Sequence, residues 1–224
     1  MTLAFDSFTL AASTAALTDE PAARAHADCL EFRMDLADDP LAALESYDGD
    51  LPILATKRAA WEGGQAADAG RLEALAEAVR FDAVGAIDVE LASILEGDAD
   101  EVLAVADEAD VAVIASSHDF EGTPPRPELV RTLTEAGKYA DVAKLAVTAA
   151  TKADTLALLS ATEQLTAHGD RVATMAMGEV GRHTRAVAPV YGSKIGYAPV
   201  DPANATAPGQ YDLETLAELV ASLE

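Results

Sequence analysis

Short apolar runs alternate along the chain with stretches in which apolar residues recur at helical spacing. One unit follows the next at intervals of roughly 25 residues, which is typical of strands separated by helices. The stretches over 72–79 and 213–220 carry apolar residues at i, i+3, i+4 and i+7, as amphipathic helices do. The apolar runs predict eight strands, at Phe8–Thr14, Cys29–Asp35, Pro52–Arg58, Ala86–Ala92, Val111–Ser117, Val142–Thr148, Val172–Gly178 and Lys194–Ala198.

Signals for the ends of helices lie between these runs. Asp100 and Asp212 stand where helices should begin, and Gly137 stands where one should end. A strand followed by a helix eight times over predicts a parallel sheet, because parallel strands need a helical crossover. We therefore predict a single domain over residues 1–224 with the α/β fold of a (β/α)8 TIM barrel. A doubly wound open sheet is the alternative, although no G-x-G-x-x-G follows the first strand.

The charge balance is strongly acidic and argues against several kinds of partner. Lys and Arg total 15 against 39 Asp and Glu, which gives a formal net charge of -24. A nucleic acid or an anionic membrane surface binds a basic patch, so we expect neither as a partner. The longest apolar runs are also shorter than the roughly 18 residues that a membrane-spanning helix needs.

Two features of the sequence point to the cytoplasm. The chain has no basic residue near its start and reaches Asp6 at once, so we expect no secretory segment. The one cysteine, Cys29, rules out an internal disulfide framework and suits a reducing compartment. Half of the residues are hydrophobic, so the acidic charge does not indicate disorder.

The same composition is typical of a protein adapted to high salt. Alanine is abundant and only five lysines occur in the chain. At 1 M salt the Debye length is about 3 Å, so most of the repulsion between surface carboxylates is screened. The acidic surface therefore indicates a habitat rather than a chemistry.

The second predicted strand carries two charges on one face. In the run from Leu30 to Met34 the apolar residues share one face, and Glu31 and Arg33 share the other. Because the apolar face must meet the helices, the two charges point into the barrel. Charges in that position are costly unless they are paired or used. They form either a structural ion pair or part of a binding site.

Other predicted strands end in side chains suited to chemistry. The third ends in Arg58, which either binds a carboxylate through two hydrogen bonds or lies exposed in a loop. The fifth runs into His118, which is either a proton donor and acceptor near neutral pH or an ordinary loop histidine. The seventh reaches Met177, a packing or pocket residue, and Arg185 follows as a candidate anion ligand.

Lys144 stands in the position best suited to catalysis. It lies in the run from Val142 to Val147, which should be buried on both faces. Burial disfavours the charged ammonium, and a neutral amine attacks a ketone or aldehyde to form a Schiff base. The alternative is a lysine whose ammonium reaches solvent beyond the strand, but apolar residues continue past it. No motif for a metal site or a phosphate loop is present, and the spacing of the His and acidic residues does not suggest a metal site.

Together these residues resemble the type I 3-dehydroquinate dehydratase family, and the resemblance covers nearly the whole chain. Each motif is short, but their order and their spacing along the barrel make the match specific. The motifs are Glu31–Asp35, Arg58 with Glu62–Gly64, Ser117–Phe120, Lys144–Val147, Met177 and Gly178 with Gly181 and Arg185, Tyr191–Ser193, and Ala207–Gln210.

The resemblance implies a reaction and a role for each site residue. The chain would convert 3-dehydroquinate to 3-dehydroshikimate and water in aromatic amino acid biosynthesis, without a metal or cofactor. Lys144 would form an imine with the C3 ketone, and His118, oriented by Glu62, would act as general base and acid. A homodimer is common in the family. The residues implied to contact the substrate are Glu31, Arg33, Arg58, Met177, Arg185, Thr206 and Gln210.

The chain departs from the family pattern at a few positions. Thr184 and Thr206 stand where serine is usual, and both keep a hydroxyl group. Phe32 replaces a common tryptophan on the helix-facing side of its strand. The first strand also begins soon after Met1, so we expect little or no N-terminal hairpin. How the lower end of the barrel is closed stays open at this point.

Other functions share part of this pattern. A class I aldolase or a transaldolase also carries a lysine on a barrel strand, but the His118 motif and Ala207–Gln210 fit those enzymes poorly. A non-catalytic barrel would use Lys144 and the arginines only to hold an anion, and a further barrel would carry its charges for structure alone. Replacement of Lys144 by alanine separates an enzyme, which loses turnover, from a protein that never had any.

We predict that the fold weakens when salt is removed. Self-repulsion among the excess carboxylates is screened at molar salt and returns at millimolar salt, so the melting temperature should fall on dialysis. Thermal unfolding followed by circular dichroism across this range measures the effect. An unchanged melting temperature would contradict the assignment of salt adaptation.

Overall fold

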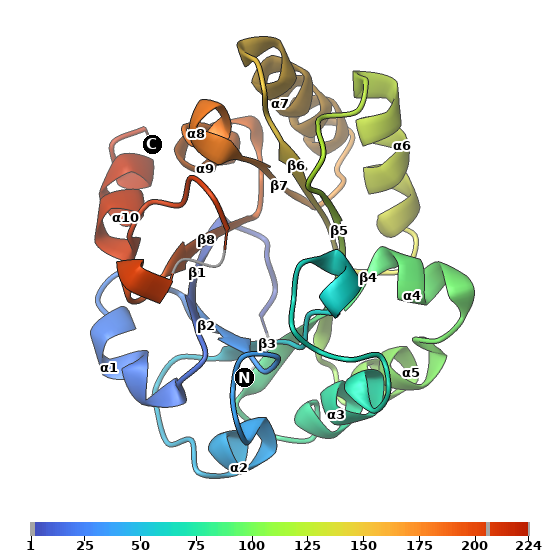
Figure 1. Cartoon of the computed structure of the whole chain (residues 1–224), viewed down its shortest axis with the longest axis vertical. Coiled ribbons are helices and arrows are strands. Elements are labelled where there is room, and N and C mark those ends of the chain that lie inside the picture. The colour runs from blue at the N-terminus through green and yellow to red at the C-terminus, as the bar shows by residue number, and fades with distance from the viewer. Residues whose placement is uncertain (1–2, 205–206, 224) are drawn as a thin grey trace.

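The structure is a computed structural model and describes residues 3–204 and 207–223. Its central feature is one parallel sheet of eight strands, surrounded by helices (Figure 1). The strands are β1 (Thr9–Thr14), β2 (Cys29–Arg33), β3 (Ile53–Thr56), β4 (Val84–Glu90), β5 (Ala112–Asp119), β6 (Val142–Thr148), β7 (Val172–Met177) and β8 (Ile195–Pro199).

The helices lie in the connections between strands and form the outer layer in Figure 1. The α-helices are α1 (Glu20–Ala23), α2 (Pro40–Glu45), α3 (Arg71–Ala78), α4 (Leu91–Glu96), α5 (Asp100–Glu108), α6 (Arg126–Ala136), α7 (Lys152–Ala167), α8 (Gly178–Gly181), α9 (Thr184–Val187) and α10 (Leu213–Ala221). Short 3-10 turns are η1 (Leu17–Asp19), η2 (Ala60–Glu62), η3 (Ala188–Tyr191) and η4 (Pro202–Asn204).

The sheet curves into a nearly closed barrel. Its strand order is β7-β6-β5-β4-β3-β2-β1-β8, so each strand lies beside its neighbour in sequence and β8 returns to β1. The remaining gap, between β7 and β8, is bridged where the Lys194 N–H donates to the Val172 carbonyl at 2.7 Å. The Thr174 N–H also donates to Ser193 Oγ at 3.0 Å across this gap. The predicted TIM barrel is confirmed, and the open doubly wound sheet is wrong.

The predicted strands are all present, with shifts at their ends. β4 begins at Val84 and stops at Glu90, because the chain turns into α4 at Leu91. β5 continues through His118, which therefore lies within the strand instead of after it. β3 is shorter than predicted and leaves Arg58 in the loop beyond it.

The predicted helix signals act much as expected. The Asp212 side chain accepts a hydrogen bond from the Thr215 N–H at 2.9 Å and caps α10. Gly137 follows α6 directly. Asp100 is the first residue of α5 rather than its cap, and there its carboxylate faces the positive end of the helix dipole.

Alternation along the strands divides the core into an outer and an inner cluster. Leu30, Phe32 and Met34 of the β2 segment belong to the outer cluster, which packs between the strands and the helices. The inner cluster fills the barrel with the opposite faces of the strands, including Ala11, Cys29, Leu54, Ile114, Met175 and Tyr197. Glu31 and Arg33 have the same parity as Cys29, so the predicted inward face of β2 is confirmed.

The chain ahead of β1 contributes to the inner cluster. Leu3 and Phe5 are 9% and 3% exposed and belong to this cluster with the inward residues of the strands. The Leu3 N–H also donates to the carbonyl of Gly85, near the start of β4, at 3.4 Å. The described residues 3–8 form no strand. These two apolar side chains therefore fill part of the barrel interior at its lower end.

In the part of the chain that the structure describes, no helix combines the length and the apolar character needed to cross a membrane.

We predict that Phe5→Ala destabilises the barrel strongly. Removing a fully packed phenylalanine leaves a cavity and lowers the free energy of unfolding by about 3 kcal/mol. Leu95→Ala is a suitable control, because this side chain is 53% exposed on α4 and its removal should cost less than about 0.5 kcal/mol. Urea unfolding in molar salt measures both. Equal effects of the two substitutions would show that Phe5 does not plug the barrel.

Candidate active site

A single pocket of about 70 Å³ gathers the predicted site residues at the carboxyl ends of the strands. Every one of them that the structure describes lines it: Glu31, Arg33, Arg58, Glu62, His118, Lys144, Met177, Arg185 and Gln210. Thr206 was also predicted to contact the substrate and lies outside the described residues.

Lys144 occupies the middle of β6 and is 4% exposed. Its Nζ donates a hydrogen bond to Asp88 Oδ2 at 2.9 Å. The same nitrogen lies 4.3 Å from the centre of the Tyr197 ring, within the range of a cation–π contact. The amine is therefore held from two sides by β4 and β8.

Asp88 connects this lysine to the neighbouring arginine. Arg58 Nη2 donates to Asp88 Oδ1 at 2.6 Å, and Ser116 Oγ donates to the same oxygen at 2.6 Å. Burial alone would raise the pKa of Asp88, but the Arg58 and Lys144 charges outweigh it and hold that pKa below its usual range. Asp88 is therefore a permanent carboxylate that keeps both cations in place.

Arg58 is buried, so the exposed loop arginine that the sequence left open is excluded. Besides Asp88, it donates to Ser116 Oγ at 2.6 Å and forms an ion pair with Glu90 at 3.3 Å. Burial disfavours its charge, yet Asp88 and Glu90 raise the pKa of Arg58 above that of a free arginine. The guanidinium is thus already occupied by side chains of the protein.

Glu62 and His118 form a second pair at the edge of the pocket. The backbone N–H of His118 donates to Glu62 Oε1 at 2.7 Å, and the same oxygen lies 3.2 Å from His118 Nδ1. Phe120 stacks on the imidazole with ring centres 6.0 Å apart. When Glu62 is ionised it accepts a hydrogen bond from the Nδ1–H group, which leaves the Nε2 lone pair unprotonated.

The surroundings shift the two pKa values of this pair in opposite directions. Burial raises the pKa of Glu62 to about 7, and the Glu90 charge adds to this while Arg58 opposes it. Burial, together with the Arg58 and Lys144 charges, lowers the pKa of His118 well below its usual value. The imidazole is therefore neutral near pH 7 and able to accept a proton.

A tight turn carries Glu62 to this position. Gly63 has a φ of +81°, a conformation that glycine adopts without strain. Gly64 lies so close to the Arg58 carbonyl that a β-carbon there would overlap it. The two glycines after Glu62 therefore allow the loop to fold back against Arg58, which explains the Glu-Gly-Gly motif.

Glu31 and Arg33 do not pair with each other in the barrel. Glu31 accepts hydrogen bonds from Ser13 Oγ and, at 3.3 Å, from Thr56 Oγ1. Arg33 instead forms two hydrogen bonds to Asp35, at 2.8 and 2.7 Å. The structural Glu–Arg pair that the sequence left open is therefore absent, and each side chain is held by other partners beside the pocket.

Arg185 differs from Arg58 in having no anionic partner among the described residues. It is 4% exposed on α9, and its Nε makes no hydrogen bond there. Burial lowers the pKa of Arg185 to about 10. Thr184 fixes this helix, because its hydroxyl donates to the Gly181 carbonyl and accepts the Ala176 N–H, each at 2.8 Å. Both contacts use the hydroxyl group, which threonine and serine side chains each carry.

The irregular segment between β8 and α10 lies over the pocket where the structure describes it. Ala207 and Gln210 line the pocket, and the Ala207 N–H donates to Gln210 Oε1 at 3.2 Å. The Pro208 carbonyl accepts the Gly178 N–H at 3.2 Å. Gly209 has a φ of +77° and lies against the Gly178 backbone, where a side chain would collide.

Comparisons with known proteins identify the family. The model of the type I 3-dehydroquinase family matches residues 8–224. The chain belongs to this family. The 3-dehydroquinate dehydratases of Haloarcula marismortui and Halobacterium salinarum are 59% and 53% identical to it. These alignments span 225 and 224 residues, 98% of this chain in each case, and 98% and 99% of the two relatives.

Solved 3-dehydroquinate dehydratases have the same fold. The 3-dehydroquinate dehydratase of Geobacillus kaustophilus superposes with a TM-score of 0.87 at 30% identity, over 97% of this chain and 91% of that one. The Clostridium difficile enzyme, solved with covalently modified comenic acid, gives 0.85 at 27% identity over 97% and 92%.

Membership in the type I 3-dehydroquinase family decides among the functions that the sequence left open. The chain is a hydro-lyase that dehydrates 3-dehydroquinate in the shikimate pathway, by the Schiff-base chemistry characteristic of type I enzymes. An aldolase, a transaldolase and a non-catalytic barrel are set aside. Haloarchaeal relatives also fit the salt-adapted composition.

Two pocket features of this dehydroquinase were only partly visible in the sequence. Asp88 alternates with Ile87 and Val89 along β4 and shares a face with Glu90, but alternation gives the direction of a side chain and not its partner. Tyr197 was not singled out, although its alternation with Ile195 places both side chains on the inner face of β8. Among the described residues, no group of three or more His, Cys, Asp or Glu is arranged to hold a metal.

We predict that Glu62→Gln stabilises the dehydroquinase above pH 7. The pKa of Glu62 rises from 4.5 to about 7 on folding, so ionising it costs stability as pH rises through this window. The variant should gain about 3 kcal/mol at pH 8 and almost nothing at pH 4.5. Denaturant unfolding at several pH values measures the difference. A gain that is equal at all pH values would contradict the shifted pKa.

Proposed function

We propose that Lys144 and His118 carry out the dehydration and that Glu62 orients His118. The observation that carries this proposal is one buried amine and one neutral imidazole facing a common pocket. Lys144 is the lysine that lines this pocket, and Asp88 and Tyr197 hold its Nζ in place. The covalently modified ligand in the Clostridium difficile relative is consistent with covalent chemistry in such a pocket.

The first half of the reaction forms the imine. The Lys144 ammonium, which is paired with Asp88, passes its proton to His118, and the resulting amine adds to the C3 carbonyl of 3-dehydroquinate. His118 returns this proton to the hydroxyl group of the adduct, which leaves as water and gives an iminium ion. The iminium withdraws electrons and makes the C2 proton acidic. His118 Nε2 takes that proton, and the electron pair of the C–H bond moves into the iminium to give an enamine.

The second half eliminates the hydroxyl group and releases the product. The enamine electrons return and expel the C1 hydroxyl, which leaves as water with the proton that His118 had taken. Water then hydrolyses the conjugated iminium to free 3-dehydroshikimate and the Lys144 amine. One water is used and two are formed, so the balance is one substrate giving one product and one water.

Glu62 sets the pH range of this cycle. As a carboxylate it accepts a hydrogen bond from the Nδ1–H group of His118 and keeps Nε2 as the base, whereas the protonated acid does not. Because the pKa of Glu62 is about 7, activity should rise with pH through neutrality.

The remaining pocket residues divide the substrate between them. Arg185 is the best candidate for the carboxylate, because it is buried and has no ion pair among the described residues. Gln210 from the segment above the pocket would complete this contact. Arg58 is already bound by Asp88 and Ser116, so it suits the substrate carboxylate less well than Arg185 does. We therefore assign the ring hydroxyls to Arg58, Glu31 and Arg33. Met177 and Thr206 are proposed to contact the ring as well.

We also propose that the enzyme is cytoplasmic and forms a homodimer. A buried single cysteine suits a reducing compartment. Exposed apolar side chains on α7, α8 and η3 offer a surface for a second copy: Leu156, Val180, Val190 and Tyr191.

Reduction with borohydride in the presence of 3-dehydroquinate tests the covalent step. We expect a stable adduct on Lys144 in molar salt, located by peptide mass mapping, and a loss of at least about 1000-fold in kcat for Lys144→Ala. Lys138→Ala is a matched control, because that lysine is exposed and, among the residues that the structure describes, forms an ion pair only with surface Glu135. A folded wild-type protein without an adduct, or turnover retained in Lys144→Ala, would refute the proposal.

A further inference from the structure

A row of alternating charges leads outward from Lys144 through the barrel wall. Asp88 and Arg58 follow Lys144, and Arg58 Nη1 lies 3.3 Å from Glu90 Oε1. Glu90 Oε2 in turn pairs with Arg71 Nη1. Glu90 is 1% exposed and Arg71 is 3% exposed, so both charges are buried although neither lines the active-site pocket.

The two carboxylate oxygens of Glu90 have different partners. Oε1 accepts the Ala59 N–H at 2.9 Å, directly ahead of the η2 turn, and also faces Arg58. This turn ends at Glu62, the residue that contacts His118. Glu90 therefore touches both the arginine that holds Asp88 and the backbone that leads to Glu62.

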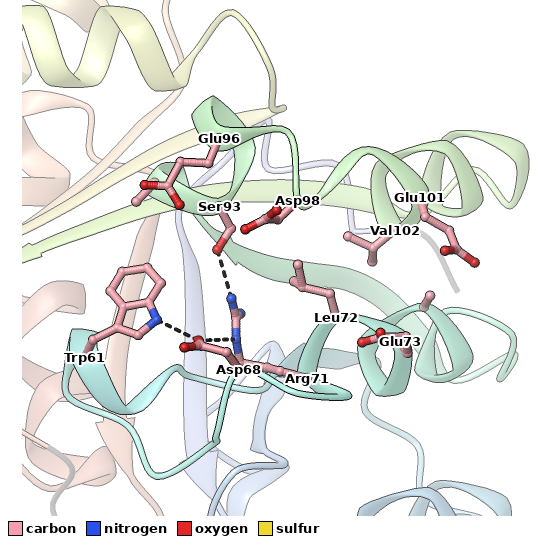
Figure 2. A pocket seen from close by; sticks show the side chains of 12 residues that line it. Trp61, Asp68, Arg71, Leu72, Glu73, Ser93, Glu96, Asp98, Glu101 and Val102 are labelled. Atoms are coloured by element: carbon pink, nitrogen blue, oxygen red, sulfur yellow. Dashed lines mark hydrogen bonds and ion pairs between the residues drawn. The ribbon is translucent and has the colours of Figure 1, made fainter.

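Arg71 fixes the outer end of this arrangement. It is the first residue of α3, and its Nη2 donates to Ser93 Oγ of α4 at 2.8 Å. Figure 2 shows Arg71 between Ser93 and Asp68, on the wall of an outer cavity of about 600 Å³. The Trp61 indole N–H donates to Asp68 at 2.7 Å. Asp68 therefore holds Trp61, the residue directly before Glu62, close to Arg71.

Glu90 needs a second cation, Arg71, because Asp88 also binds Arg58. Arg58 is shared by two buried carboxylates, and its 2.6 Å contact goes to Asp88 while the 3.3 Å contact goes to Glu90. Without Arg71, Glu90 would keep the Ala59 N–H but would have Arg58 as its one cationic partner among the described residues, and it would compete with Asp88 for that arginine. The pair with Arg71 leaves Arg58 bound to Asp88, and Asp88 bound to Lys144.

We propose that Glu90, held by Arg71, is a positioning residue for the dehydration that aligns Lys144 and His118 together. It acts on Lys144 through Arg58 and Asp88, and on His118 through the Ala59–Glu62 turn. The inference rests on the proposed roles of Lys144 and His118. Neither Glu90 nor Arg71 contacts the substrate.

Glu90→Gln tests this role. Each oxygen of Glu90 accepts a hydrogen bond, one from Arg71 and one from the Ala59 N–H. In the glutamine variant an NH₂ group replaces one of these oxygens, so one of the two hydrogen bonds is lost. We expect kcat to fall at least about tenfold, with KM changed less than about threefold, because positioning is lost and substrate contacts remain. Arg71→Met should have the same effect, and Arg71→Lys should restore part of the activity.

Glu20→Gln is the matched control for a merely structural effect. Glu20 is also 1% exposed, pairs with Arg24 at 2.5 Å and accepts the N–H groups of Asp50 and Leu51 at 3.3 Å. It lies on α1, which α2 separates from α3 in Figure 1. This variant should lose stability and keep kcat within about twofold of the wild type.

The pH profile gives a readout that lost stability would not change. Glu62 faces the charged or titratable groups of Arg58, Glu90, Asp88 and His118. Because the Glu90 charge contributes to the raised pKa of Glu62, the acid limb of kcat/KM should move to lower pH in Glu90→Gln. The limb should stay in place in Glu20→Gln.

The outcomes separate this inference from the proposed function. Wild-type kcat and an unmoved acid limb in both Glu90→Gln and Arg71→Met would overturn the positioning role alone. A loss of kcat in Glu20→Gln as large as the loss in Glu90→Gln and Arg71→Met would also overturn the positioning role. Absence of a Lys144 adduct in the folded wild type would overturn the proposed function and this inference together. If Glu90→Gln does not fold, Arg71→Met, which keeps the Glu90 carboxylate, decides the question.

Discussion

The active end of the barrel depends on a buried carboxylate that two cations share. Asp88 is 2% exposed and contacts Arg58, Lys144 and Ser116, three groups from three other strands or loops. A charge in the barrel interior without such partners would cost several kcal/mol. The contacts that make its burial tolerable also determine where the Lys144 amine lies. Stability and catalytic geometry therefore depend on the same interactions, and a side chain that loosens Arg58 changes both.

A second consequence of burial is that Glu62 and His118 have shifted pKa values. Water is excluded from the pair, so the charged forms of both groups are disfavoured, and the positive charges of Arg58 and Lys144 further disfavour an imidazolium. The result is a neutral histidine near pH 7 beside a carboxyl group that ionises in the same range. Pairs of titratable groups whose surroundings alter their pKa values in this way are typical of acid–base catalysis.

Charge is distributed very differently inside the barrel and on its surface. The buried charged residues that the structure describes comprise five acidic and five basic side chains, whereas the whole chain has 39 acidic and 15 basic residues. The acidic excess therefore lies among the less buried positions, where salt screens it. Charges in the interior cannot be screened by ions and must be balanced by partners. This difference separates the adaptation to salt from the chemistry of the site, although both use carboxylates.

Much of the fold and the site follows from local sequence patterns. Apolar periodicity predicts the strands and helices, and alternation within a strand determines that Glu31 and Arg33 face the interior, because successive side chains point to opposite faces whatever the strand packs against. Contacts between distant residues are a different matter. The pairing of Lys144 with Asp88, of Arg58 with Glu90 and of Glu90 with Arg71 depends on how closely strands and helices approach after the barrel closes. The sequence by itself determined which side chains face inward and which residue types the site contains. Only the tertiary structure decided which charges meet, because that distance is a property of the closed barrel and not of any one strand.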